Sequence, residues 1–292
     1  NAAIFYNVWR YYETTDDAEF LADYGAELMI EIARFWASTA HWNPERERYE
    51  IHGVMGPDEF HDGYPDAKAP YPTLYFLPGY SASAEELATC LPLRQMSALF
   101  GMAVVIPEGE NSFYTDHPER ATQHGCYVGD ELVEITRTLL PSLSHQPQNT
   151  FIGGISMGGY GAAVLGLQRP DTFSRIAMLS PAIEPDRLFE KTGEGAVPST
   201  LFDALFGGAE RYAASLLNPR NAIAALKKSG KNLPRLYMCC GRQDWLVRDA
   251  CLSFRDFLQE EGVPLCYEEG DGQHDIPYWD DRLESCFRFL RA

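Results

Sequence analysis

The chain is poor in positive charge and contains no long apolar run. Its 24 Lys and Arg residues are outnumbered by 42 Asp and Glu residues, which gives a formal net charge of -18 over 292 residues. A chain this acidic is a poor partner for nucleic acid or for an anionic membrane surface. No stretch approaches the roughly 18 uncharged apolar residues that a membrane span needs. We therefore expect no nucleic-acid partner and no membrane partner.

The cysteine pattern argues against a small fold held together by zinc or by disulfide bonds. There are seven, an odd number, and Cys239 and Cys240 are adjacent, so neither a zinc-binding spacing nor a disulfide framework is present. Most lie in apolar stretches, which predicts buried, reduced thiols. The first ten residues lack the basic and then apolar pattern of a signal peptide. We expect a cytoplasmic location.

Residues 1–68 form a mainly helical, aromatic-rich segment that ends in a linker. Residues 16–41 carry apolar side chains at spacings of three and four, which is typical of one face of a long helix. Thr14, Thr15 or Asp16 could cap its start. The face is formed by Phe20, Tyr24, Leu28, Ile32, Phe35 and Trp36. Because monomers rarely expose such a patch, we expect it to pack on the rest of the chain or on a second copy, as a homodimer.

From residue 69 to residue 292 the pattern changes to short apolar runs that alternate with helical ones. This alternation predicts an α/β domain, with a mostly parallel sheet and helices on both of its faces. The predicted strands are residues 74–77, 102–106, 151–154, 175–179, 236–240 and 264–268. The predicted helices are residues 83–100, 129–140, 157–168 and 247–261.

The clearest motif is Gly154-Ile155-Ser156-Met157-Gly158, between a predicted strand and a predicted helix. In that context a Gly-x-Ser-x-Gly sequence makes a tight turn that exposes a nucleophilic serine above the sheet. The same letters also occur by chance in glycine-rich turns with an incidental serine. The strand before the motif and the helix after it favour Ser156 as a nucleophile.

Serine needs a base to take its proton, and the base needs an acid to orient it. In this type of site the order along the chain is Ser, acid, His, each on a loop after a later strand. Asp244 and His274 fit that order, since each follows a predicted strand. Asp271 and Asp275 are rival acids, but they are too close to His274 in sequence to reach behind it.

An acyl-transfer site also needs two fixed donors for the oxyanion. The backbone N–H of Met157 directly follows the nucleophile. A second donor is expected from the loop after the first buried strand, and we choose the backbone N–H of Tyr80. Gly79 beside it could equally be a simple turn residue.

Residues 70–292 resemble a bacterial family of α/β-hydrolases that includes tributyrin esterase, S-formylglutathione hydrolase (esterase D) and feruloyl and acetyl-xylan esterases. The resemblance rests on residues 71–80 (YPTLYFLPGY), 111–116 (NSFYTD), 240–244 (CGRQD) and 272–274 (GQH), together with the serine motif. It implies hydrolysis of short acyl esters without a metal or an organic cofactor, with Tyr114 and Gly79 in contact with substrate. The chain departs from the family at Pro78, where many members have His, and in lacking two antiparallel strands before Tyr71.

Residues 4–65 resemble part of a different family, the inverting disaccharide phosphorylases for maltose, trehalose and kojibiose. The matching segments are residues 35–38 (FWAS), 43–46 (NPER), 48–51 (RYEI) and 53–61 (GVMGPDEFH). The resemblance places the family's general acid at Glu59, but a segment this short cannot enclose a sugar and a phosphate. We expect Glu59 to be inactive. A natural fusion, an assembly artefact and an engineered chimera all fit the composite pattern.

The leading hypothesis is a serine carboxylic ester hydrolase that acts through an acyl-enzyme on short-chain esters. Its substrate would be a small molecule or an oligosaccharide that carries an ester. An acyltransferase with the same fold is one alternative, and a catalytically impaired hydrolase-fold scaffold is another.

Overall fold

The computed structural model describes residues 8–9, 11–12, 14–43, 48–51, 69–117, 122–190 and 199–292. The chain divides into two compact units, Asn1–Asp66 and Ala67–Ala292. Each unit is described by itself. No helix in the described ranges is long and apolar enough to cross a membrane.

The N-terminal unit is built on one long helical stretch. It runs through α2 (Ala18–Phe20), the π-turn η1 (Leu21–Gly25) and α3 (Ala26–Thr39), so the prediction of a helix here is confirmed. Its cap differs from the prediction, because Asp17 accepts a hydrogen bond from the Phe20 N–H at 2.9 Å. After the helix, β1 (Ala40–Asn43) pairs antiparallel with β2 (Arg48–Ile51).

The predicted aromatic face of this helix is only partly buried. Ile32 is buried, whereas Tyr24 is 70% exposed and Leu28 is 43% exposed. The side chains of Phe35 and Trp36, like residues 52–68 with Glu59, lie outside the described residues. Homodimer formation through this face stays a prediction.

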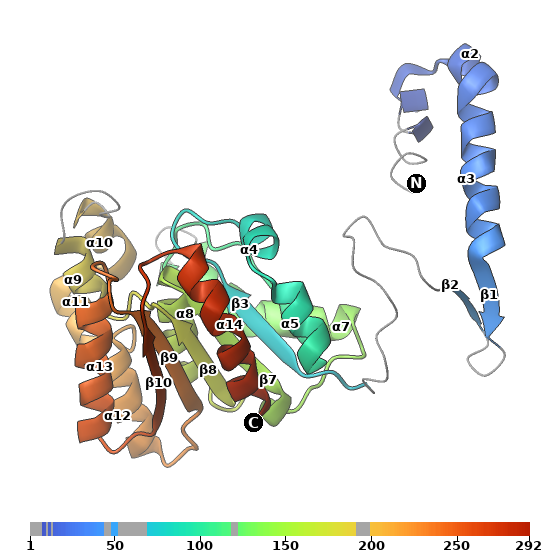
Figure 1. Cartoon of the computed structure of the whole chain (residues 1–292). Helices are drawn as coiled ribbons and strands as arrows, with labels where there is room; N and C mark the ends of the chain where they lie inside the picture. Colours follow the sequence, from blue (N-terminus) through green and yellow to red (C-terminus); the bar gives the residue numbers. More distant parts are fainter. Residues whose placement is uncertain are drawn as a thin grey trace. The chain divides into compact units, whose positions relative to one another are not determined.

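The second unit is organised around one parallel sheet of six strands, in the order β10-β9-β8-β7-β3-β4 (Figure 1). Every neighbouring pair in it is parallel. All six predicted strands are found, so the α/β prediction is confirmed. The strands are β3 (Thr73–Leu77), β4 (Ala103–Val105), β7 (Thr150–Ile155), β8 (Arg175–Leu179), β9 (Arg235–Gly241) and β10 (Leu265–Gly270).

Helices cover both faces of this sheet. On one face, α5 and α14 contribute to an apolar cluster with Leu93 and Leu283; on the other, α8 and α13 contribute to a second cluster with Val164 and Phe254 (Figure 1). Two short strands, β5 (Asp116–His117) and β6 (Thr122–Gln123), form a separate ribbon. The helices are α4 (Ala84–Cys90), α5 (Leu93–Phe100), α6 (His124–Cys126), η3 (Tyr127–Glu131), α7 (Leu132–Leu139), η4 (Pro147–Asn149), α8 (Met157–Gln168), α9 (Pro185–Glu190), α10 (Ser199–Phe206), α11 (Ala209–Ala214), α12 (Pro219–Ser229), α13 (Arg248–Glu260) and α14 (Ile276–Arg291).

Two details differ from the sequence-based expectations. The helix expected at residues 83–100 is divided into α4 and α5, because Leu91 is extended before Pro92, as the proline ring requires of the residue preceding it. The cysteines are buried at only four positions, whereas Cys90 and Cys266 are exposed and Cys126 is half-buried. The prediction of buried thiols is therefore wrong for the two exposed residues.

Candidate active site

Ser156 occupies a tight turn between β7 and α8. Its backbone has φ 55° and ψ -116°, an unfavourable conformation for a residue with a side chain. Such strain is typical of a nucleophile held on a sharp strand-to-helix turn. Gly158 is required two residues later, since a Cβ there would lie 2.0 Å from the Leu77 carbonyl oxygen. The turn thus presses the start of α8 against the end of β3.

The three side chains of the predicted triad come together in one hydrogen-bonded chain. His274 Nε2 lies 2.9 Å from Ser156 Oγ, and His274 Nδ1 lies 2.7 Å from Asp244 Oδ2. They come from loops that follow β7, β9 and β10. Because these strands are parallel, their carboxyl ends meet at one edge of the sheet, which explains how residues more than a hundred positions apart come into contact.

The Asp244 carboxylate is fully buried and is held from several sides. Its Oδ1 accepts the backbone N–H groups of Leu246 and Val247, both at 3.1 Å. The Cys240 thiol lies 3.9 Å from Oδ2, within reach of a weak S–H donor. These contacts compensate for burial of the charge and aim Oδ2 at the histidine ring.

The two rival acids have other roles. Asp271 is 81% exposed and pairs with Arg242 at 3.2 Å. Asp275 caps α14, since its Oδ1 accepts the N–H of Tyr278 at 3.2 Å. Neither has a recorded contact with the ring of His274, so among the described residues Asp244 is the carboxylate at the histidine.

The loop that carries His274 is tied to the loop that carries Asp244. The Gly272 N–H donates to Gln243 Oε1 at 2.7 Å, and the Gln243 N–H donates to the Gly272 carbonyl at 3.0 Å. Trp279, on the first turn of α14, packs its ring against the imidazole at a centroid distance of 5.1 Å and an interplanar angle of 87°. Neither Gln243 nor Trp279 was predicted from the sequence. Gln243 lies inside the 240–244 motif, but nothing in the local pattern indicated Trp279.

Met157 follows Ser156 directly, and Tyr80 lies in the loop after β3, the strand that pairs with the one leading into Ser156. Met157 is the first residue of α8, where the backbone N–H groups have no carbonyl partner inside the helix. Tyr80 follows β3, which pairs directly with β7 so that Leu77 lies opposite Gly154. Gly79 lies close to the nucleophile, because a Cβ added to it would be 3.5 Å from Ser156 Cβ.

Tyr114 differs from the expectation that it contacts substrate. Its side chain is 1% exposed, and its hydroxyl donates to the carbonyl oxygen of Pro78 at 2.9 Å. Burial, with a smaller contribution from the Glu108 carboxylate, raises the pKa of Tyr114, so the hydroxyl keeps its proton and acts as a donor. Tyr114 therefore lies behind the loop that carries Tyr80 rather than in the substrate site.

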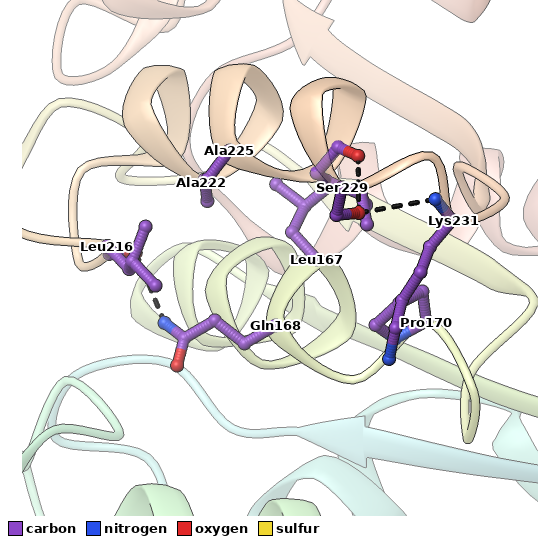
Figure 2. Close-up of a pocket in the computed structure, with 9 residues that line it drawn as sticks. Leu167, Gln168, Pro170, Leu216, Ala222, Ala225, Ser229 and Lys231 are labelled. Atoms are coloured by element: carbon purple, nitrogen blue, oxygen red, sulfur yellow. Dashed lines mark hydrogen bonds between the residues drawn. The ribbon is translucent and has the colours of Figure 1, made fainter.

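Other sites are less informative. No cluster of three or more His, Cys, Asp or Glu side chains in the described ranges could hold a metal ion. A hollow of about 190 Å³ lies between the end of α8 and α12, with Leu167, Gln168 and Ser229 among its lining residues (Figure 2). None of its lining residues belongs to the triad, so this hollow is separate from the hydrogen-bonded site.

The chain matches two families of known proteins. Residues 53–290 match the family described as "Putative esterase", and residues 1–68 match the glycosyl hydrolase family 65 central catalytic domain. An acetyl esterase of Caldicellulosiruptor saccharolyticus is 34% identical over 221 residues, which is 75% of this chain and 82% of that protein.

The N-terminal segment is similar in sequence to a phosphorylase, and the fold is similar to that of a solved hydrolase structure. A kojibiose phosphorylase of Thermoanaerobacter brockii is 51% identical over 61 residues, 21% of this chain, and the chain spans only 8% of its length. The structure of a fluorophosphonate-binding serine hydrolase of Staphylococcus aureus shares the fold, with a TM-score of 0.69, 23% identity, and coverage of 87% of this chain and 96% of that one. The chain belongs to the esterase family and is a carboxylic ester hydrolase.

Proposed function

We propose that Ser156 is the nucleophile, His274 the general base and Asp244 the orienting acid of an esterase that acts through an acyl-enzyme. The observation that carries the proposal is the unbroken chain from Ser156 Oγ through the imidazole to a fully buried carboxylate. Loss of either contact would leave a serine hydroxyl that reacts poorly at neutral pH.

In the acylation step His274 is neutral, with its proton on Nδ1 and directed at Asp244. Nε2 accepts the Ser156 proton while Oγ attacks the ester carbonyl carbon, and Asp244 stabilises the imidazolium that forms. The carbonyl oxygen becomes an oxyanion that receives hydrogen bonds from the N–H groups of Met157 and Tyr80. His274 then gives its proton to the departing alkoxide, which leaves as the alcohol, and the acyl group stays on Oγ.

The second step removes the acyl group by the same groups acting on water. His274 takes a proton from a water molecule as its oxygen attacks the acyl carbon, and the oxyanion forms again at the same two N–H groups. When this intermediate collapses, the proton on Nε2 returns to Ser156 Oγ and the carboxylic acid is released. No metal ion or organic cofactor takes part in these steps.

For the substrate we propose short acyl groups, with acetyl or similar esters of carbohydrates as the class to test first. Two observations support this choice. A relative 34% identical to this chain carries the name acetyl esterase. The first 68 residues match a carbohydrate-active family, which suggests a carbohydrate-degrading setting.

The test is Ser156→Ala, assayed with p-nitrophenyl acetate and by labelling with a fluorophosphonate. We expect kcat to fall by about 10⁶ and labelling to disappear, as in other sites that lose a triad nucleophile. Ser253→Ala is the matched control, because its hydroxyl bonds to Glu184 and Arg220 away from the triad. A Ser156→Ala rate within tenfold of the parent would refute the assignment, whereas a parent that neither hydrolyses the ester nor takes the label would favour a scaffold. Excess acceptor alcohol separates hydrolysis from acyl transfer by the product formed.

A further inference from the structure

The loop that carries Tyr80 is held at three successive peptide groups. The Pro78 carbonyl accepts from the Tyr114 hydroxyl at 2.9 Å, and the Gly79 carbonyl accepts from the Ala82 N–H at 3.3 Å. The Ser81 N–H donates to Asn111 Oδ1. The peptide between Gly79 and Tyr80 contains the donor N–H, so both of its neighbours and its own carbonyl are fixed.

Two of these three contacts come from one segment, residues 108–116 after β4, which we call the clamp loop. It makes further contacts with the same neighbour. The Phe113 ring lies 6.2 Å from the Tyr80 ring, centroid to centroid, and the Glu108 carboxylate accepts the Ala84 N–H at 3.1 Å. The clamp loop therefore follows the loop that carries Tyr80 over much of its length.

The Tyr114 ring fits between two positions that have no side chain. A Cβ on Gly161 of α8 would lie 2.3 Å from a ring carbon of Tyr114, and a Cβ on Gly109 would lie 2.7 Å from its hydroxyl oxygen. Neither position can carry a side chain while the ring stays where it is. The ring is thus held between two glycines, with its hydroxyl directed at Pro78.

The clamp loop has an unfavourable backbone. Glu110, Asn111, Phe113 and Tyr114 have φ of 46°, 55°, 49° and 53°, in the left-handed region that residues with a side chain rarely adopt. Internal hydrogen bonds of Ser112 keep the loop in this shape, to the Gly109 carbonyl at 2.7 Å and from the Tyr114 N–H at 3.1 Å. Backbone strain of this kind persists only where the surrounding structure holds the residues firmly in place, and it is concentrated near functional sites.

We propose that Asn111 and Tyr114 are positioning residues that fix the direction of the Tyr80 N–H before substrate arrives. The inference rests on the proposed function, in which that N–H stabilises the oxyanion. A donor that already points at the site of the developing charge needs no reorganisation during the reaction. The hydrogen bonds of Asn111 and Tyr114 that hold this loop go to Ser81 and Pro78, so we expect their effect to pass through the loop that carries Tyr80.

Tyr114→Phe removes only the hydroxyl, whereas Asn111→Ala removes the acceptor for Ser81 and also places alanine at a left-handed φ of 55° that asparagine tolerates better. Because loss of one oxyanion donor costs about 10² to 10³ in kcat, we expect a misdirected donor to cost about 10- to 100-fold, with KM within threefold. A trifluoromethyl ketone forms an oxyanion on the serine, so its inhibition constant should rise by the same factor as kcat/KM falls. Asn111→Asp keeps an oxygen at the same place. If kcat falls more than tenfold in Asn111→Ala, kcat of Asn111→Asp should be at least tenfold higher than that of Asn111→Ala.

The matched control is Tyr237→Phe. Tyr237 on β9 is equally buried, and its hydroxyl donates to Glu268 Oε2 at 3.1 Å, in a part of the sheet that carries neither a triad residue nor the clamp loop. Its kcat should stay within twofold. The proposal is overturned if folded Tyr114→Phe keeps kcat within twofold, or if Tyr237→Phe loses as much as Tyr114→Phe. Ser156→Ala distinguishes a failure of the proposed function from a failure of this inference. If Ser156→Ala stays active, the proposed function fails, whatever the Asn111 and Tyr114 variants do.

Discussion

Gly158→Ala tests whether the close approach of α8 to β3 sets the geometry of the site. A Cβ at this position would lie 2.0 Å from the Leu77 carbonyl oxygen and 2.6 Å from that of Pro78. Ordinary van der Waals contact begins near 3.4 Å. The added methyl group therefore needs a separation of more than about 1 Å between two backbones, and no flexible side chain is there to move instead.

The methyl group would displace the backbone of Leu77 and Pro78, which leads into Gly79 and Tyr80. A misplacement of about 1 Å at a reacting centre can cost about 10² in rate, so we expect kcat for p-nitrophenyl acetate to fall about 100-fold at 25 °C. Overpacking of this kind costs about 1–3 kcal/mol of unfolding free energy. For a unit of this size that corresponds to a fall in Tm of about 2–10 °C, which a thermal melt can measure.

Gly230→Ala is the matched control for loss of a glycine. Gly230 follows α12 at φ 72°, and nothing lies within 4 Å of where its Cβ would be. A left-handed non-glycine residue costs about 1–2 kcal/mol, so its Tm should fall while kcat stays within twofold. If folded Gly158→Ala keeps kcat within threefold of the parent, the close approach does not control the position of the oxyanion donors.

Three other predictions concern Asp244, the cysteines and Glu59. Asp244→Asn should lower kcat by about 10⁴, because an amide can hold His274 in the wrong tautomer, and a loss below tenfold would contradict the role of Asp244. Iodoacetamide should modify Cys90 in the native protein but not Cys239, whose pKa burial raises to about 12, as peptide mass mapping can check. Glu59→Gln should leave kcat/KM within about twofold, and the parent should release no glucose 1-phosphate from maltose, trehalose or kojibiose with phosphate; sugar phosphate that disappears in the variant would show the opposite.

The parallel sheet could be predicted because its central strands are buried on both faces and therefore appear as continuous apolar runs. Ser156, Asp244 and His274 could be named together because each follows a predicted strand in a fixed order along the chain, although the strand before His274, β10, lies at the edge of the sheet and is partly polar. Pro92 could have indicated the break between α4 and α5, since a proline restricts the residue before it. These features depend on local sequence, which a single chain displays directly.

Tyr114 illustrates what local sequence does not display. An aromatic side chain in a polar loop suggests contact with a ligand, yet here the ring is buried because Gly161, on a distant helix, leaves room for it. The helices α9 to α12 were also not anticipated, and their main contacts are with one another and with α8. The contact between Trp279 and His274 likewise depends on how α14 lies against the sheet.

The central helix α8 has a consequence for how this enzyme can change. From Met157 to Leu167 all of its residues are buried, so no side of it faces solvent along this length. Almost any substitution there must be accommodated by the core, and the residues that support the nucleophile can therefore vary little during evolution. The loops after β3, β9 and β10 carry Tyr80, Asp244 and His274, so they cannot be exchanged freely either. Substrate preference can therefore change with least damage in segments that carry neither a triad residue nor an oxyanion donor.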